Sequence, residues 1–321
     1  MSLFPDLDDE RAPQAARLAP RLRALADEGL SFGTSSWKYE GWLGSIYDEA
    51  RYRARGKFSR KLFEETCLAN YAETFPTVCG DFAFYQFPSE AYWERLFGQT
   101  PERFTFAFKV PEDITVATWP THARYGTRAG RENDTFLDAE VFERHFARRL
   151  EPYKHRVATL IFEFGTFNKA TFSTPADFMA KFDPFLDALP EGFRYSVEIR
   201  NPDFLRPDYF HLLSSHNTAH VFNAWTRMPT LEEQVQLPDA DTADFTVVRA
   251  LLRKGRAYEQ AVKSFEPYRE LQEPDEGARE AMRQLAERSR KARKPAFLFV
   301  NNRLEGHAPS TIESVVNMFT F

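Results

Sequence analysis

Cysteine is nearly absent from this chain of 321 residues, which contains only Cys67 and Cys79. Two cysteines provide no disulfide framework, and no Cys-x-x-Cys motif occurs. This scarcity is typical of proteins in a reducing compartment, so we expect a cytoplasmic protein. The N-terminal residues 1–6 are acidic and lack the basic and apolar regions of a signal peptide, which favours the same location.

Long apolar runs and familiar catalytic motifs are missing as well. No run approaches the roughly 18 residues that a membrane span needs, so we expect no membrane partner. Histidines at zinc-binding spacings, glycine-rich phosphate loops and the Gly-x-Ser-x-Gly elbow do not occur. The sequence therefore implies no cofactor and no zinc site, and any bound cation would be a hard one held weakly by carboxylates.

An excess of positive charge is also lacking, because the formal net charge is -5. This balance disfavours a nucleic-acid partner held by bulk charge. The chain nevertheless has 42 lysines and arginines, which leave room for a local basic groove. Hydrophobic residues make up 43% of the chain and include 32 phenylalanines, enough for a large aromatic core.

Eight short apolar runs end on polar, charged or small residues, and a helical pattern follows most of them. The runs cover residues 30–34, 78–85, 104–109, 158–163, 195–200, 219–223, 245–249 and 296–302. Such alternation predicts an α/β fold, a (β/α)8 barrel of the TIM type. Active sites of this fold lie where the strands end, so the terminal polar residues form the candidate site.

The length suits one domain rather than two. We expect an N-terminal extension over residues 1–29, with a helix at 13–25, followed by the barrel over 30–321. Two connections are unusually long. The loop 110–136 after the third strand is of the kind that often forms a lid. The connection 252–295 after the seventh strand contains two helical patterns, at 258–268 and 278–291.

Three charged residues near strand ends are the catalytic candidates: Glu198, Glu163 and Lys109. Adjacent strands lie about 4.8 Å apart, so the two carboxylates can face one another as an acid/base pair or hold a cation. The alternative is that neighbouring cations neutralise them and support the barrel. Lys109 can act as an amine nucleophile or an anion anchor, and a salt bridge to Glu163 is the alternative for it.

Polar and aromatic residues around the predicted barrel mouth are candidates for ligand binding. Arg200 and Arg249 can form an anion pocket with Lys109. Asparagine amides orient ligands by donating and accepting at once, although asparagines also favour turns. Aromatic rings can stack on a flat ligand or can simply belong to the core. The candidates are Trp37, Tyr39, Tyr85, Arg200, Asn223, Arg249, Asn301 and Asn302.

At these residues the chain resembles the DUF72 family, also called YecE-like, a group of barrel proteins with no established activity. The matching segments include Gly33-Thr34-Ser35-Ser36-Trp37, Phe84-Tyr85, Pro101-Glu102-Arg103-Phe104 leading to Lys109, Val197-Glu198-Ile199-Arg200-Asn201-Pro202, Arg249 and Asn301-Asn302. They follow the family's order over almost the whole chain. Cys79 and Asn223 stand where acidic residues are usual, Asp81 replaces an asparagine, and Glu163-Phe164-Gly165 replaces Gln-Leu-Pro. These departures relocate carboxylates around the mouth.

The sequence favours an enzyme that acts in the barrel mouth on a small polar, anionic ligand. By analogy with the fold alone, a hydrolase is the first expectation and an isomerase or lyase the second. A binding module for a nucleotide, a sugar or single-stranded nucleic acid remains an alternative. A scaffold that uses the arginine-rich connection 252–295 as its partner surface is the third hypothesis.

Overall fold

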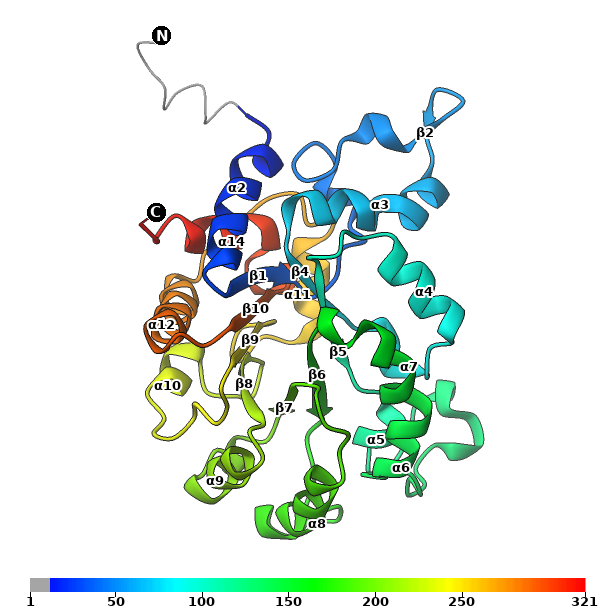
Figure 1. Ribbon diagram of the computed structural model, residues 1–321, viewed down its shortest axis with the longest axis vertical. Coiled ribbons are helices and arrows are strands. Elements are labelled where there is room, and N and C mark those ends of the chain that lie inside the picture. The colour runs from blue at the N-terminus through cyan, green and yellow to red at the C-terminus, as the bar shows by residue number, and fades with distance from the viewer. Residues whose placement is uncertain (1–11, 321) are drawn as a thin grey trace.

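The computed structural model describes residues 12–320, in which eight parallel strands close into a barrel (Figure 1). The strands are β1 (Leu30–Thr34), β4 (Thr77–Gly80), β5 (Thr105–Lys109), β6 (Val157–Phe164), β7 (Tyr195–Ile199), β8 (Ala219–Ala224), β9 (Thr246–Ala250) and β10 (Ala296–Val300). Each strand pairs with its neighbours along the chain, and β1 closes the ring by pairing with both β10 and β4. The predicted (β/α)8 barrel is therefore confirmed.

Helices lie between the strands and surround the barrel. In chain order they are α2 (Gln14–Asp27), α3 (Arg60–Thr74), α4 (Glu90–Gly98), α5 (Glu112–Thr115), α6 (Ala139–Phe142), α7 (Arg148–Leu150), α8 (Pro175–Asp187), α9 (Pro207–Ser215), α10 (Leu231–Val235), α11 (Tyr258–Phe265), α12 (Glu276–Ala292), α13 (Asn302–Glu305) and α14 (Ala308–Val316). A small hairpin, β2 (Arg53–Ala54) with β3 (Lys57–Phe58), precedes α3.

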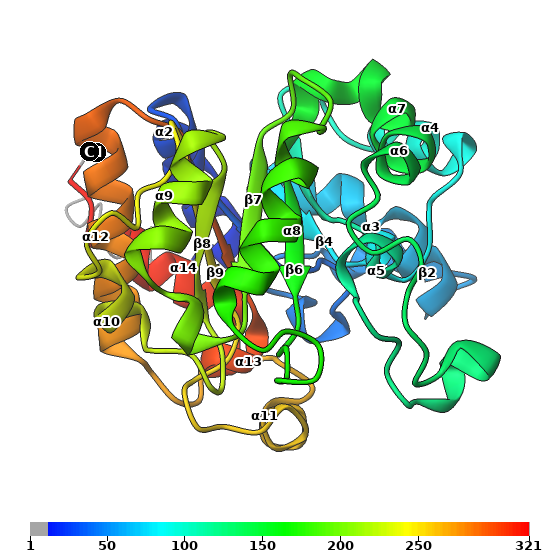
Figure 2. The ribbon, with the colours of Figure 1, turned by 90° about the horizontal axis from the view of Figure 1, so that it is seen from below.

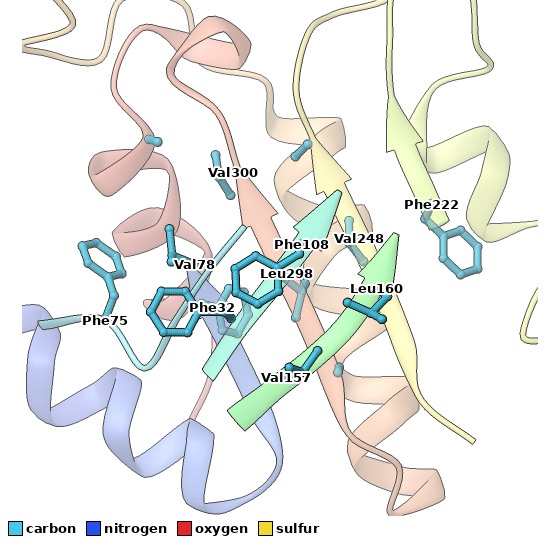
Figure 3. Close-up of a cluster of buried hydrophobic side chains, with 14 of the residues drawn as sticks. Phe32, Phe75, Val78, Phe108, Val157, Leu160, Phe222, Val248, Leu298 and Val300 are labelled. Carbon is cyan, nitrogen blue, oxygen red and sulfur yellow. The ribbon is translucent and has the colours of Figure 1, made fainter. Parts of the chain in front are cut away.

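Side chains of each barrel strand alternate between two apolar clusters, because successive residues of a strand point to opposite faces. Val248 and Leu298 belong to the large cluster that packs against the helices, part of which Figure 3 shows. Val247 and Phe299 belong to a smaller, separate cluster inside the barrel. Gly33 allows β1 to approach β4, since a Cβ atom there would lie 2.1 Å from the Thr77 carbonyl oxygen. The barrel interior is therefore filled by apolar side chains.

The second strand is shorter than its apolar run predicts. Strand β4 ends at Gly80, and Phe82–Tyr85 forms a 3-10 helix instead, so the predicted strand 78–85 is wrong beyond Gly80. The backbone of Asp81 is helical, with φ -86° and ψ -11°, which ends the extended conformation. The Phe82 ring folds back over Gly80, where a Cβ atom would lie 2.5 Å from it. Apolar residues that continue a run can thus belong to the turn after the strand.

The helix predicted over 13–25 is α2, which packs on the barrel. Leu18, Leu22 and Leu25 are buried, and Arg17 pairs with Glu313 of α14 at 2.9 Å. Residues 1–11 of the predicted extension lie outside the described residues. Between residues 12 and 320, no helix has both the length and the apolar character needed to cross a membrane.

Both long connections contain helices and begin at the C-terminal ends of the strands. The loop 110–136 contains α5 and a 3-10 helix, Ala123–Arg128, and its two arms meet at Thr118 and Glu132. The two helical patterns predicted in the connection 252–295 correspond to α11 and α12. Figure 2 shows α11 at the same end of the barrel as α13, whereas α12 packs along β9 and β10.

Candidate active site at the C-terminal end of the barrel

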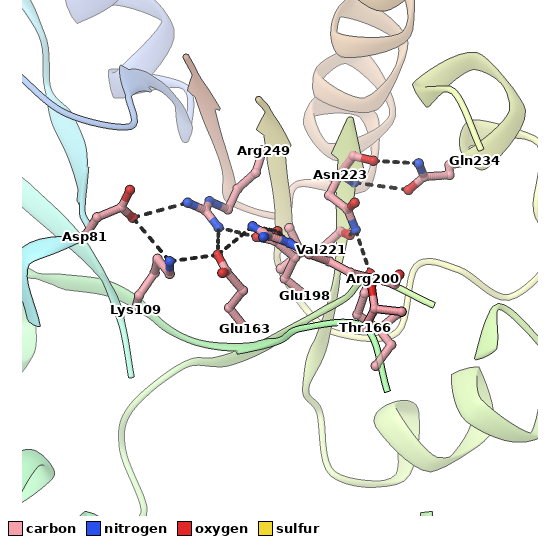
Figure 4. Close-up of polar contacts among 11 residues, drawn as sticks. Asp81, Lys109, Glu163, Thr166, Glu198, Arg200, Val221, Asn223, Gln234 and Arg249 are labelled. Atoms are coloured by element: carbon pink, nitrogen blue, oxygen red, sulfur yellow. Dashed lines mark hydrogen bonds and ion pairs between the residues drawn. The ribbon is translucent and has the colours of Figure 1, made fainter. Parts of the chain in front are cut away.

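Six charged side chains gather at the C-terminal end of the barrel, above its apolar interior (Figure 4). The strand alternation explains their direction. Ile161 and Val247 point inward, so Glu163 and Arg249, two residues further along, point inward too. The same reasoning applies to the other strands. The six residues are Asp81, Lys109, Glu163, Glu198, Arg200 and Arg249.

Glu163 is the centre of this cluster, because three cations contact one of its oxygens. Its Oε2 atom lies 3.0 Å from Lys109 Nζ, 2.9 Å from Arg200 Nη2 and 2.8 Å from Arg249 Nη1. Burial alone would raise the pKa of Glu163, but Arg200, Lys109 and Arg249 together lower it below its ordinary value. The carboxylate is therefore ionised at neutral pH and is a weak base. The salt bridge that we considered for Lys109 is present.

Glu198 lies directly opposite Glu163, since the two residues are register partners on β7 and β6. Arg249 Nη1 donates hydrogen bonds to both carboxylates, which offsets their repulsion. Arg200 donates from Nε and Nη2 to Glu198 Oε1 at 3.0 and 2.9 Å. Glu198 and Arg200 thus share one side of the chain, as predicted. Glu198 is fully buried beneath the site, and both of its oxygens are occupied by arginines.

Arg249 joins the two sides of the cluster. Its Nη2 atom lies 3.3 Å from Asp81 Oδ1, in addition to the contacts with Glu163 and Glu198. Burial lowers the pKa of a guanidinium, but Glu198, Asp81 and Glu163 raise that of Arg249 well above its ordinary value. The side chain is therefore a permanent cation, and it holds together the carboxylates of Glu163 on β6, Glu198 on β7 and Asp81 in the turn after β4.

A cavity of about 360 Å³ opens above this cluster. Its walls come from strand ends, the loop 110–136, α11 and α13. Five basic and three acidic side chains line it, so the cavity favours negative charge. The lining residues are Asp81, Phe84, Tyr85, Lys109, Glu112, Val116, Pro120, Arg124, Tyr125, Glu163, Gly165, Arg200, Trp225, Arg249, Leu251, Tyr258 and Arg303.

Aromatic rings hold four of the five basic side chains of the cavity in place. The pairs are Lys109 Nζ over Phe84 at 3.8 Å, Arg200 Cζ over Trp225 at 3.8 Å, Arg124 Cζ over Tyr85 at 4.5 Å and Arg303 Cζ over Tyr258 at 4.4 Å from the ring centroid. The negative face of a ring attracts a cation without neutralising it. The rings therefore fix the positions of these cations without adding negative charge to the cavity.

Tyr85 is the predicted aromatic candidate that lines the cavity, and its side chain is 55% exposed. Trp37 and Tyr39 are not among the lining residues. The Trp37 ring packs edge-on against Phe82. Tyr39 packs between Trp42 and Tyr268, and burial raises its pKa to about 12. These two aromatic residues occupy core positions beside the mouth.

The three asparagine candidates also lie outside the cavity wall. Asn223 exchanges backbone hydrogen bonds with the Gln234 side chain, and its amide donates to the Ile199 carbonyl. Asn301 Oδ1 accepts from the backbone N–H of Arg303 at 3.0 Å, and Asn302 Oδ1 accepts from that of Ala308 at 2.8 Å. Asn301 and Asn302 therefore shape the turn after β10, the alternative that the sequence left open.

Several cavity residues come from loops that sequence reasoning did not single out. The clearest is Glu112, which is 4% exposed although it lies in the loop after β5. Its Oε2 atom accepts a hydrogen bond from the Tyr125 hydroxyl at 2.7 Å and from Arg124 at 3.3 Å. Burial raises the pKa of Glu112, and Tyr125 and Arg124 offset this only in part. The sequence offered one indication that Glu112 belongs to the site: it lies three residues after Lys109, in a loop predicted to form a lid.

Arg303 is another such residue and differs from the other cations of the cavity. Lys109, Arg124, Arg200 and Arg249 each pair with a carboxylate. Across residues 12–320, Arg303 makes no such pair, and its buried Nε atom lacks a hydrogen-bond partner. It is therefore the cavity cation best placed to receive a negative group from a ligand.

The acidic residues of the site face cations rather than one another. Within the described part of the chain, no group of three or more histidine, cysteine, aspartate and glutamate side chains is arranged to hold a metal ion. The site is therefore a cluster of buried ion pairs whose charges are held in fixed positions.

Comparison with known proteins identifies relatives along the whole barrel. The family model described as "Protein of unknown function DUF72" matches residues 31–320. The UPF0759 protein YecE of Escherichia coli K12 is 31% identical over 139 residues, which are 43% of this chain and 43% of that protein. The matched region thus covers less than half of this curated relative.

Solved structures share the fold. A DUF72 family protein from Thermotoga maritima aligns with a TM-score of 0.58 at 18% identity and covers 90% of this chain and 96% of its own. A DUF72 family protein from Enterococcus faecalis V583 aligns with a TM-score of 0.59 at 14% identity, covering 91% and 96%. At such identities the likeness shows the fold alone.

Proposed function

The chain belongs to the DUF72 family of proteins of unknown function, and we propose that it is an enzyme whose active site is the cavity above Glu163. Its ligand is a small polar molecule that carries negative charge. The observation that supports this most is the lining of the cavity, with five basic side chains, one of which, Arg303, has no carboxylate partner among residues 12–320. Hydrolysis is the first reaction to test, and isomerisation or elimination the second, by analogy with the fold.

The geometry supports different roles for the three catalytic candidates. Lys109 lines the cavity and binds the anionic group together with Arg303. Glu163 has a lowered pKa and is a weak base, so its role is to hold Lys109, Arg200 and Arg249 in position. Glu198 is a positioning residue, because it is fully buried and fixes Arg200 and Arg249.

Proton transfer in the cavity is better assigned to Glu112. Its pKa is raised by burial, which brings a carboxyl group closer to neutral pH, where general acids and bases work best. Glu112 lines the cavity, and its partner Tyr125 lines it as well. In this proposal one carboxyl group from the loop 110–136 takes the acid/base role that the sequence assigned to Glu163 and Glu198.

A binding module without turnover is the alternative function. The aromatic side chains Phe84, Tyr85, Trp225 and Tyr258 line the cavity and suit a nucleotide base or a sugar. A cavity of about 360 Å³ suits a small molecule, which disfavours a long nucleic acid. The scaffold hypothesis has less support, because arginines of α12 pair with glutamates of the same helix: Arg279 with Glu276, Arg283 with Glu280 and Arg290 with Glu287.

The direct test is to capture metabolites from a cell extract, identify them by mass spectrometry and assay each retained compound for turnover. We expect retention of an anionic compound, conversion of that compound, and loss of retention in Arg303→Met. Lys61→Met is the matched control, since Lys61 lies on α3 with its side chain 85% exposed. Retention without turnover would favour the binding module. Retention of no anion, or equal retention by Arg303→Met, would contradict the proposed site.

A further inference from the structure

A second cleft, of about 510 Å³, adjoins the cavity. It lies between the loop after β5 and the loop after β6, and we call it the side cleft. Its lining consists of residues 115–121, 130, 165–168 and 171. Val116, Pro120 and Gly165 line both spaces, so the cavity and the side cleft meet at these three residues. A ligand bound at Lys109 can therefore extend outward between the two loops.

The chemistry changes where the two spaces meet. Eight charged side chains line the cavity, whereas among residues 12–320 the side cleft is lined by no lysine, arginine, aspartate or glutamate. Its accessible polar side chains include four threonines and one asparagine, Thr118, Thr121, Thr166, Thr171 and Asn168, whereas the hydroxyl of Thr115 is buried. Neutral hydroxyl and amide groups bind uncharged polar ligands by donating and accepting hydrogen bonds.

Several of these polar groups are available to a ligand. The hydroxyls of Thr118 and Thr121 are exposed and make no hydrogen bond with any described residue. Asn168 uses its Oδ1 atom to accept from the backbone N–H groups of Ala170 and Thr171 at 2.8 and 3.0 Å. This fixes the amide orientation and leaves its Nδ2 donor without a partner in the described chain. Free donors and acceptors thus occur on both sides of the side cleft.

Aromatic side chains accompany these polar groups. Trp119 and Phe167 contribute to the lining from the two opposite loops. Trp119 is largely buried and carries the Arg128 guanidinium on its ring at 4.1 Å, so Phe167 offers the more accessible ring. Sugar rings present apolar C–H faces and hydroxyl edges, so they match a wall that combines aromatic rings with hydroxyl and amide groups. An uncharged, hydroxyl-rich group is therefore the ligand chemistry that fits the side cleft.

We infer, on the basis of the proposed function, that the ligand has two parts. Its anionic group binds in the cavity near Lys109 and Arg303, and an uncharged sugar moiety binds in the side cleft. The substrate class is thus an anionic sugar derivative, a sugar phosphate or a sugar acid, rather than a simple anion. The hydroxyl groups give the side cleft its selectivity, and the cations of the cavity give the charge preference.

Gly165 offers a way to separate the two spaces. A Cβ atom at this position meets no atom of the described chain within 4 Å, so the fold tolerates a larger residue there. Because Gly165 lines both spaces, the side chain of Gly165→Leu would fill their junction. Gly98→Leu is the matched control, since a Cβ atom at Gly98, the last residue of α4, also meets nothing within 4 Å.

The experiment is calorimetric titration of the wild type and both variants with inorganic phosphate, a set of hexose and pentose phosphates, hexuronic acids and the neutral sugars. At least one sugar phosphate or sugar acid should bind about ten-fold more tightly than phosphate, a difference well within the reach of a few added hydrogen bonds. Gly165→Leu should remove most of this advantage, and Gly98→Leu should retain it.

The outcomes distinguish this inference from the proposed function. The two-part ligand is wrong if phosphate binds but no sugar derivative binds more tightly. It is also wrong if Gly165→Leu retains the full difference in affinity between the sugar derivative and phosphate. In both cases the proposed anion site is still supported. If the neutral sugars bind as well as their phosphates, the anionic part is wrong. If none of these compounds binds the wild type, the proposed anion site fails, and the two-part ligand fails with it.

Discussion

At the scale of single residues, Glu163 determines how the buried cluster responds to acid. In Glu163→Gln the cations Lys109, Arg200 and Arg249 would face only two carboxylates. Breaking such buried pairs costs about 3–5 kcal/mol, so we expect the free energy of unfolding to fall by that order at pH 7. Urea unfolding measures it.

The pH dependence of this difference has a definite sign. Folding lowers the pKa of Glu163 below the ordinary value of 4.5, so its stabilisation is complete above pH 4.5 and is lost as the pH falls further. The wild type and Glu163→Gln should therefore become more similar in stability below pH 4.5. A difference that stays constant down to pH 3 would contradict the assigned ionisation.

His220 provides a second acid-sensitive position, far from the cavity. Its ring packs against Phe210 and Phe222, and neither ring nitrogen has a hydrogen-bond partner in the described chain. Burial lowers its pKa from 6.5 to about 3. The unfolded chain takes up a proton near pH 6.5, whereas the folded protein does so only near pH 3. Stability is therefore lost between these values, by about 1.4 kcal/mol per pH unit.

Replacement of His220 by leucine should remove this loss. We expect His220→Leu to keep more of its free energy of unfolding than the wild type as the pH falls from 6.5 to 5. His211→Leu is the control, because His211 is an exposed residue of α9. Chemical denaturation at several pH values measures the slopes, and equal slopes for the wild type and His220→Leu would show that this histidine is not the acid-sensitive group.

At the scale of elements, a buried hydrogen bond joins two parts of the loop 110–136 beside the cavity. The hydroxyl of Tyr125 donates a hydrogen bond to the buried carboxylate of Glu112. Tyr125→Phe removes this hydrogen bond and leaves Glu112 buried with Arg124 as its remaining partner. We expect faster hydrogen exchange in residues 116–132, with little change in the barrel strands, since local openings are governed by local contacts.

Tyr153→Phe is the matched control for this prediction. Tyr153 stacks on Phe97, and its hydroxyl has no hydrogen-bond partner among the described residues. Hydrogen exchange followed by mass spectrometry compares the two variants. Unchanged exchange in residues 116–132 of Tyr125→Phe would mean that Glu112 does not hold the loop.

The elements also show how far sequence patterns reach. The two-residue alternation of a strand is local, so it predicts that Lys109, Glu163 and Glu198 point into the barrel end, as they do. The length of a run is less informative, because Phe82 and Tyr85 continue the apolar run of β4 after the backbone has already turned at Asp81. The residues of the turn are as apolar as those of the strand, so composition does not show where the strand ends.

At the scale of the whole molecule, the closed barrel determines which distant segments meet. Once β1 pairs with β4 and β10, all strand ends lie around one opening, and the charged cluster follows. Residues that reach the cavity from loops depend instead on tertiary contacts. Glu112, Arg124 and Arg303 come from segments whose positions are set by packing against the barrel. Sequence patterns place Glu112 in a candidate lid but do not predict that it turns into the cavity, and for this reason sequence reasoning did not single these residues out.

The same global view explains the candidates that lie elsewhere. Asn301 and Asn302 follow a strand, as ligand-binding residues often do, but their side chains are used to cap backbone groups. A polar residue at a strand end therefore has two uses, and the sequence does not distinguish them. The family match supports the barrel, and the contacts of each side chain decide its role.

The central claim is that the cavity binds an anion through Lys109, and it is tested most directly by the affinity for inorganic phosphate of Lys109→Met. Glu163 keeps Arg200 and Arg249 as partners in this variant, so the fold should survive with a melting temperature lower by a few degrees. We expect phosphate affinity to fall about ten-fold or more, because removal of a buried charged partner costs at least 1.4 kcal/mol. Lys61→Met should bind as the wild type does. Undiminished phosphate binding by folded Lys109→Met, or no phosphate binding by the wild type, would contradict the account.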